Sequence, residues 1–138
     1  MSDAKEARGV TELRLVVTAS DYDEAVRFYR DTLGLKERAA FSSEGGHVTI
    51  LEAGRATLEI TDPVHAAFID RVEVGRRVAG HIRVAFEVAD TVSSTRRLVD
   101  AGARLVAEPV ETPWKSLNSR LEGPGDLQLT LFSDLPDV

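Results

Sequence analysis

Apolar and polar residues alternate in several short segments of this chain, and such alternation predicts β-strands with one buried face. The first segment spans residues 13–18, where Leu13, Leu15 and Val17 share one face and Arg14 lies on the other. Three similar segments follow, separated by the turn sequences SSEGG and EAGR, at residues 36–41, 47–52 and 56–61. The first half of the chain therefore predicts one strand, a break, and three more strands.

The break, at residues 21–34, has the periodicity of a helix. Ser20 or Asp21 supplies a short oxygen side chain that can cap the first amide groups, and Gly34 can take the left-handed conformation that ends a helix. Apolar residues recur on one side of this helix, and they predict an apolar stripe of Ala25, Val26, Phe28, Tyr29 and Leu33.

The same pattern repeats 69 residues later, because LRLVVTASD at 13–21 corresponds to IRVAFEVAD at 82–90. This offset aligns Arg14 with Arg83, and it also aligns the strand ATLEIT with GDLQLT, so that Glu59 meets Gln128. The second half then predicts a strand at 82–88, a helix at 91–101 that ends at Gly102, and strands at 104–107, 116–122 and 127–132. The repeat indicates a duplicated module, and it directs the search for function to the place where the two copies face each other.

Residues 62–80 break the repeat and predict a linker with a short helix at 65–72. The length of 138 residues favours a single domain, 1–138, with modules at about 12–61 and 81–133. Within the linker, His65 and Phe68 could form a lid over a site, or they could belong to an amphipathic helix on the surface.

Composition narrows the possible partners. The formal charge is −6, from 17 basic and 23 acidic residues, and the basic residues are scattered, so nucleic acid is not an expected partner. Cysteine is absent, the N-terminal MSDAKEARG has no apolar run behind it, and no segment approaches the ~20 apolar residues of a membrane span. We expect a cytoplasmic protein with no membrane partner.

Several motifs together resemble one family. The strand before Asp21, the helix with AVRFYRDTLGL, the strand ATLEIT and the second copy VAFEVAD are similar to the vicinal oxygen chelate superfamily, which includes glyoxalase I, extradiol dioxygenases and bleomycin-resistance proteins. The resemblance covers about residues 12–133, and FYxxxLGL at 28–35 is a fairly specific part of it. It implies an α+β fold in which two paired βαβββ modules form an open, cup-shaped mixed sheet with helices outside.

In metal-dependent members, side chains from the first and last strand of each module converge on a divalent ion. Transferred to this sequence, these positions are Arg14, Glu59, Arg83 and Gln128. The family usually has His or Gln at the first position and His at the third, whereas this chain has arginine at both. A guanidinium has no lone pair to offer a metal, so the expected cofactor is none.

His81 offers an alternative, because strand alternation places it on the same face as Arg83. If the GH dipeptide sets the register, as in glyoxalase I, then His81, Glu59 and Gln128 would give a set of ligands for a weakly held divalent ion. That alignment needs a two-residue bulge before Asp90, whereas the alignment through Arg83 needs no gap.

Two interpretations of the arginines remain open. Arg14, Arg83 and Glu59, with Glu87, could form a buried ion cluster with no function beyond filling the cup. Alternatively, the arginines could bind an acidic or carbonyl-rich ligand through forked hydrogen bonds. Trp114, in the loop ETPWKSLNSR, could stack on a flat ligand or pack against its own loop.

The expected function is therefore binding of a small, acidic or aromatic molecule in the cup without a metal, as in bleomycin-resistance proteins. The alternative is a lyase, isomerase or dioxygenase that uses the metal set of His81, or a metal-independent enzyme with Glu59 or Glu87 as base. We also expect a homodimer, in which the paired modules come from one chain or from two.

Overall fold

The computed structural model describes residues 9–124 and 127–136. The first half contains β1 (Glu12–Thr18), helix α2 (Tyr22–Val26) with its continuation η1 (Arg27–Thr32), β2 (Glu37–Ser43), β3 (Gly46–Ala53) and β4 (Ala56–Thr61). Helix α3 (Pro63–Glu73) connects it to the second half, which contains β5 (Ile82–Glu87), α4 (Thr91–Asp100), β6 (Arg104–Glu111), β7 (Ser116–Gly123) and β8 (Leu127–Asp134). In the described residues, no helix is long and apolar enough to span a membrane.

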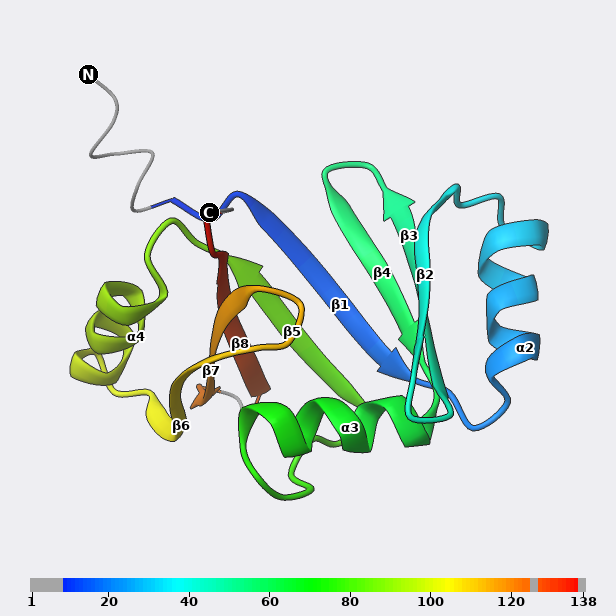
Figure 1. Ribbon diagram of the computed structural model, residues 1–138. Coiled ribbons are helices and arrows are strands. Elements are labelled where there is room, and N and C mark those ends of the chain that lie inside the picture. Colours follow the sequence, from blue (N-terminus) through cyan, green and yellow to red (C-terminus); the bar gives the residue numbers. More distant parts are fainter. Residues whose placement is uncertain (1–8, 125–126, 137–138) are drawn as a thin grey trace.

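All eight strands belong to one open mixed sheet in the order β2-β3-β4-β1-β5-β8-β7-β6, with α2 and α4 at its two ends and α3 across one face (Figure 1). The predicted α+β fold class is confirmed. The two halves join where β1 and β5 pair antiparallel, with Leu13 opposite Phe86 and Val17 opposite Ile82. Both modules of the cup therefore come from a single chain.

The first helix differs from its prediction in its second half. Asp21 caps it by accepting a hydrogen bond from the amide of Glu24 at 3.0 Å, as expected. From Arg27 onward the helix is π-helical, and the amide of Leu33 donates to the carbonyl of Phe28 at 2.8 Å. The wider turn rotates side chains away from an α-helical stripe. Phe28 and Leu33 are 54% and 61% exposed, so these two residues of the predicted apolar stripe do not face the core.

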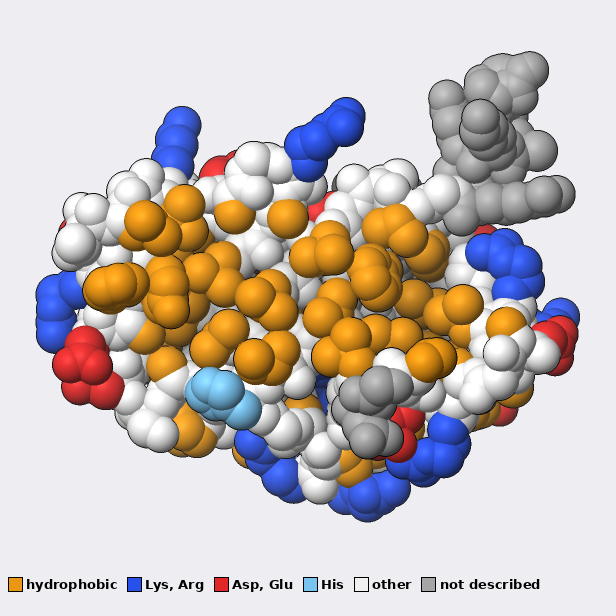
Figure 2. Space-filling model, turned by 180° about the vertical axis from the view of Figure 1, so that it is seen from behind, with side chains coloured by type: hydrophobic (Ala, Val, Ile, Leu, Met, Phe, Trp, Pro, Cys, Tyr) orange, Lys and Arg blue, Asp and Glu red, His pale blue; other side chains and the backbone are white. Residues whose placement is uncertain are grey.

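Each module has its own hydrophobic core between its helix and its outer strands. One core is built on Val26, Leu51 and Ile60, and the other is built on Val88, Leu121 and Leu131. Neither core includes five of the apolar side chains of β1 and β5 that point away from the cup, although Phe86, on the same side of β5, packs against the second core. These side chains form the outer face of the sheet, where apolar side chains gather when the molecule is viewed from behind (Figure 2), and they are Leu13, Leu15, Val17, Ile82 and Val84.

Helix α3 lies against the concave side of the sheet, where it covers part of the cup (Figure 1). Asp62 caps it by accepting the amide of His65 at 2.8 Å. Gly46, at the start of β3, permits the close approach, because a Cβ there would lie 2.3 Å from the backbone nitrogen of His65. The linker helix is thus longer than predicted, and it forms one wall of the cup.

Candidate functional site

A cavity of about 630 Å³ lies between the concave side of the sheet, α3 and the loop before β7. This volume is within the roughly 300–1,000 Å³ typical of small-molecule sites. Its floor comes from the central strands of both modules and includes Arg14, Val16, Glu59, Arg83, Ala85 and Thr130. The cavity therefore lies where the two copies of the module face each other.

Arg14, at one side of the floor, already has anionic partners. Its Nε lies 2.5 Å from a carboxylate oxygen of Glu12, and its Nη1 lies 3.7 Å from Glu59. Its guanidinium carbon also lies 4.7 Å from the centre of the Phe132 ring. The charge of Arg14 is thus matched by the protein itself.

Arg83 is in a different situation, although it lies on the same floor. It is only 9% exposed, and its Nη1 donates to the hydroxyl of Thr130 at 2.7 Å. Arg83 forms no ion pair with a carboxylate of the described residues. Burial lowers the pKa of the Arg83 guanidinium, and the carboxylates of Glu73 and Glu59 partly oppose this shift. The floor therefore holds a buried cation without a contacting counterion in the described part of the chain.

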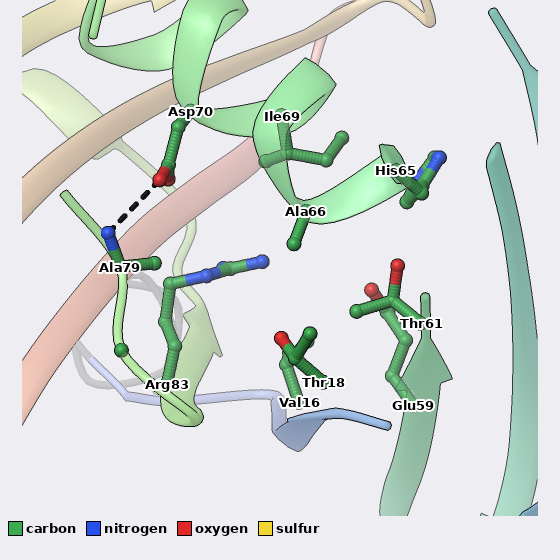
Figure 3. Close-up of a pocket in the computed structure, with 11 residues that line it drawn as sticks. Val16, Thr18, Glu59, Thr61, His65, Ala66, Ile69, Asp70, Ala79 and Arg83 are labelled. Atoms are coloured by element: carbon green, nitrogen blue, oxygen red, sulfur yellow. Dashed lines mark hydrogen bonds between the residues drawn. The ribbon is translucent and has the colours of Figure 1, made fainter. Parts of the chain in front are cut away.

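Glu59 supplies a carboxyl group beside both arginines. Burial raises the pKa of Glu59, while Arg83 and Arg14 act to lower it. Beneath α3 there is a second, much smaller space of about 10 Å³, enough for about one water molecule. Figure 3 shows the Arg83 side chain extending into this space from β5, while Glu59 and Thr61 enter it from β4.

The model of the glyoxalase/bleomycin resistance protein/dioxygenase superfamily matches residues 13–131. The chain belongs to this superfamily. The resemblance predicted from FYxxxLGL and the duplicated strands is confirmed. Among curated proteins, none matches the sequence.

Several solved structures share the fold of this chain. Methylmalonyl-CoA epimerase from Mycobacterium tuberculosis is 22% identical, with a TM-score of 0.62, and the match covers 93% of this chain and 89% of that one. A hypothetical protein from Bacillus halodurans is 16% identical, with a TM-score of 0.64 and coverage of 94% and 96%. A variant of 4-hydroxymandelate synthase from Streptomyces coelicolor is 23% identical, with a TM-score of 0.63, over 95% of this chain and 40% of that one. At these identities the similarity shows the fold alone.

The superfamily's ligand positions are filled differently from the prediction in the second module. In the first module, Val16 on β1 lies opposite Glu59 on β4. In the second, Ala85 on β5 lies opposite Thr130 on β8, so Thr130 takes the place equivalent to Glu59. The predicted equivalence of Glu59 and Gln128 is therefore wrong. The hairpins of the second module are longer, and the constant offset of 69 residues is lost before the last strand.

The structure does not bring together His81, Glu59 and Gln128, the alternative set of metal ligands. His81 is exposed, and neither it nor Gln128 lines either cavity. Within residues 9–124 and 127–136, no group of three or more His, Asp or Glu side chains could hold a metal ion. Two arginines and a threonine also make a poor donor set beside Glu59, since a guanidinium cannot coordinate a cation. The residues present do not fit the divalent ion of metal-dependent superfamily members. Glu87, the other candidate base, is half-buried and does not line the cavity.

Gln128 instead belongs to a buried ion network that sequence reasoning missed. Arg120 on β7 is fully buried, with its Nη1 2.9 Å from Asp70 and its Nη2 2.7 Å from Glu73. Gln128 accepts from Arg120 at 3.1 Å and donates to the carbonyl of Val78 at 2.8 Å. This network, Arg120 with Asp70, Glu73 and Gln128, fixes α3 to the second module. No local pattern in the sequence indicates pairs between residues so far apart.

Aromatic side chains surround the mouth of the cavity. Trp114 is 45% exposed, its ring centre lies 6.3 Å from that of Phe68 on α3, and both rings line the cavity together with Phe41. His65 is buried beside them, with Nδ1 2.8 Å from the hydroxyl of Ser43, and burial lowers the pKa of His65. His65 and Phe68 thus lie at the cup, which agrees with the lid interpretation and not with a surface helix.

Proposed function

We propose that this protein binds a small organic molecule in the cup and needs no metal ion to do so. The observation that carries this proposal is the cavity of about 630 Å³ between both modules and α3. Cavities of this size, with mostly apolar walls and a few polar groups, are the usual form of a ligand site. Membership of the superfamily supports the location, because its modules form a cup.

The wall of the cavity favours a molecule with a flat, apolar part. Val48 and Ile50 on β3 are buried side chains of this wall, and Phe41, Phe68 and Trp114 lie toward its mouth. Aromatic side chains stack favourably on planar rings. A planar aromatic or heteroaromatic compound therefore fits the apolar part of the site.

A matched pair of alanines on β2 tests the location. Ala39 lines the cavity, whereas its neighbour Ala40 is exposed and lies on the other side of the strand. We expect Ala39→Phe to fill the cavity and abolish binding, and Ala40→Phe to leave binding unchanged. The measurement is thermal melting of both variants with a panel of planar aromatic compounds, followed by calorimetric titration of those that raise the melting temperature of the unmodified protein. Equal binding by the two variants would place the ligand elsewhere.

A second candidate function is proton transfer on the bound molecule by Glu59. It is favoured by the raised pKa of this carboxyl, caused by burial, at a position that faces the cavity between two arginines. A carboxyl with a raised pKa is a stronger base than an ordinary one, and a neighbouring arginine can stabilise an enolate. Exchange of a ligand's C–H hydrogen in D₂O, seen by NMR and lost in Glu59→Gln, would support this function. Full exchange in the variant would exclude Glu59 as the base.

We further propose that the protein forms a homodimer through the outer face of the sheet. Ile82, on this face, is 45% exposed and lies among other apolar side chains that neither core covers (Figure 2). Contiguous apolar surfaces commonly mark interfaces. Ile82→Glu should produce monomers in light scattering, whereas Val64→Glu, on α3 and 50% exposed, should remain dimeric. A monomeric unmodified protein at tens of micromolar would contradict this proposal.

A further inference from the structure

Arg83 retains hydrogen-bonding capacity that the protein does not use. A guanidinium offers five N–H donors, and within the described residues Arg83 donates a hydrogen bond only from Nη1, to the hydroxyl of Thr130. No fully buried side-chain nitrogen or oxygen in that part of the chain lacks a hydrogen-bond partner. The other nitrogens of Arg83 must therefore have access to solvent, and Arg83 lines both cavities. Its free donors face the interior of the cup.

A buried cation of this kind is costly unless something compensates it. Removing a charge from water has a desolvation penalty, which an ion pair or a set of hydrogen bonds must offset. Arg120, the other buried arginine of this region, has two contacting carboxylates, whereas Arg83 has none in the described residues. If Arg83 only filled space, an apolar side chain would serve better. Its retention is explained if an anion from outside the protein completes its contacts.

Arg14 does not share this property, although the repeat makes it the counterpart of Arg83. Its contacts with Glu12 and Glu59 already match its charge, and it is stacked over Phe132. The two arginines at equivalent positions therefore differ in role.

We infer that Arg83 is the receptor for an anionic group, and that the ligand of the cup is an organic acid with an apolar body. This inference rests on the proposed function. A carboxylate matches the planar fork of a guanidinium through two parallel hydrogen bonds. Its body would extend from the floor toward the aromatic rings at the mouth.

The neighbouring charges favour a singly charged group. Glu59 lines the same cavity, Glu73 acts on Arg83 from α3, and both carboxylates repel added negative charge. With one open guanidinium and these two acidic neighbours, a carboxylate is accommodated better than a doubly charged phosphate.

The test compares an acid with its uncharged isostere, 2-naphthoate with 2-naphthamide, by calorimetric titration of three proteins. The unmodified protein should bind the acid at least about 10-fold more tightly than the amide. Arg83→Met should lower the affinity for the acid by at least about 30-fold, the scale expected on removing a buried charged contact. It should change the affinity for the amide by less than about 3-fold. Arg14→Met, on the same cavity floor, should weaken binding of the acid clearly less than Arg83→Met does, because Glu12 and Glu59 already pair with Arg14.

Thermal melting of the same variants separates recognition from a structural role. Arg83→Met should melt at the same temperature as the unmodified protein or higher, because it removes a buried charge without a contacting counterion. If Arg83→Met does not fold, Arg83→Lys provides a second test. Lysine keeps the positive charge but cannot form the two parallel hydrogen bonds of a guanidinium, so it should still lower the affinity for the acid by about 10-fold.

Three results would overturn the inference: equal affinity for acid and amide, full acid affinity in Arg83→Met, or a large loss from Arg14→Met alone. Binding of the amide without preference for the acid would refute this inference and leave the proposed function standing. Failure of both compounds and of the wider aromatic panel would refute both.

Discussion

Replacing Arg120 with methionine should cost far more stability than the same change at Arg83. Both arginines are buried, but Arg120 contacts Asp70 at 2.9 Å and Glu73 at 2.7 Å. After the change, Asp70 keeps Arg77 at 2.6 Å and the amides of Val78 and Ala79. Among the described residues, Glu73 keeps a hydrogen bond from Asn118 at 2.8 Å and a 3.4 Å contact with Thr130. The main loss is therefore one buried carboxylate without its cation.

Breaking a buried ion pair by removing one partner costs about 3–5 kcal/mol. For a domain of this size, each kcal/mol lowers the melting temperature by roughly 3–5 °C, so Arg120→Met should melt about 10–20 °C lower. The double change Arg120→Met with Glu73→Met removes both charges, and it should recover a large part of the loss.

Urea unfolding followed by circular dichroism measures these free energies, and the single and double changes form a cycle. A loss below about 1 kcal/mol for Arg120→Met would refute the assignment of the Arg120 network as the attachment of α3. So would a double change that is less stable than the single one.

Gly46→Ala should displace α3, because a Cβ at this position would lie 2.3 Å from the backbone nitrogen of His65. The variant should therefore have a lower melting temperature and a lower ligand affinity than the unmodified protein. Burial raises the pKa of Glu59, so this carboxyl stabilises the fold fully below its ordinary pKa, and the contribution is lost as pH rises through the folded-state pKa. Glu59→Gln should therefore gain stability relative to the unmodified protein as pH rises from 4 to 8. A difference in the free energy of urea unfolding that does not change with pH would contradict this. Asp21→Ala and Asp90→Ala each remove a helix cap, and each should cost about 1 kcal/mol in the same unfolding measurement.

The strands and the first-strand site residues could be predicted because strand alternation is a local property. Arg14 and Arg83 lie on the cavity floor as their positions in β1 and β5 indicate. The offset failed at Gln128, because hairpin lengths differ between the modules and a shift in register moves another residue into the equivalent place.

Other features depend on contacts between distant segments. The pairing of Asp70 and Glu73 with Arg120 forms only after α3 crosses the sheet. The different roles of Arg14 and Arg83 also depend on tertiary contacts, since Glu12 happens to lie next to Arg14. The π-helical turn at η1 leaves no period that distinguishes it from an α-helix in so short a segment.

Metal-independent binding in the cup is tested by titrating 2-naphthoate into protein from which metals have been removed. The protein is treated with EDTA, shown by elemental analysis to contain no stoichiometric divalent metal, and compared with untreated protein and with Ala39→Phe. We predict equal affinity before and after EDTA, and no binding to Ala39→Phe. Binding that disappears with EDTA, returns with Zn²⁺, Ni²⁺, Mn²⁺ or Fe²⁺, and is lost in His81→Ala would contradict a metal-independent site.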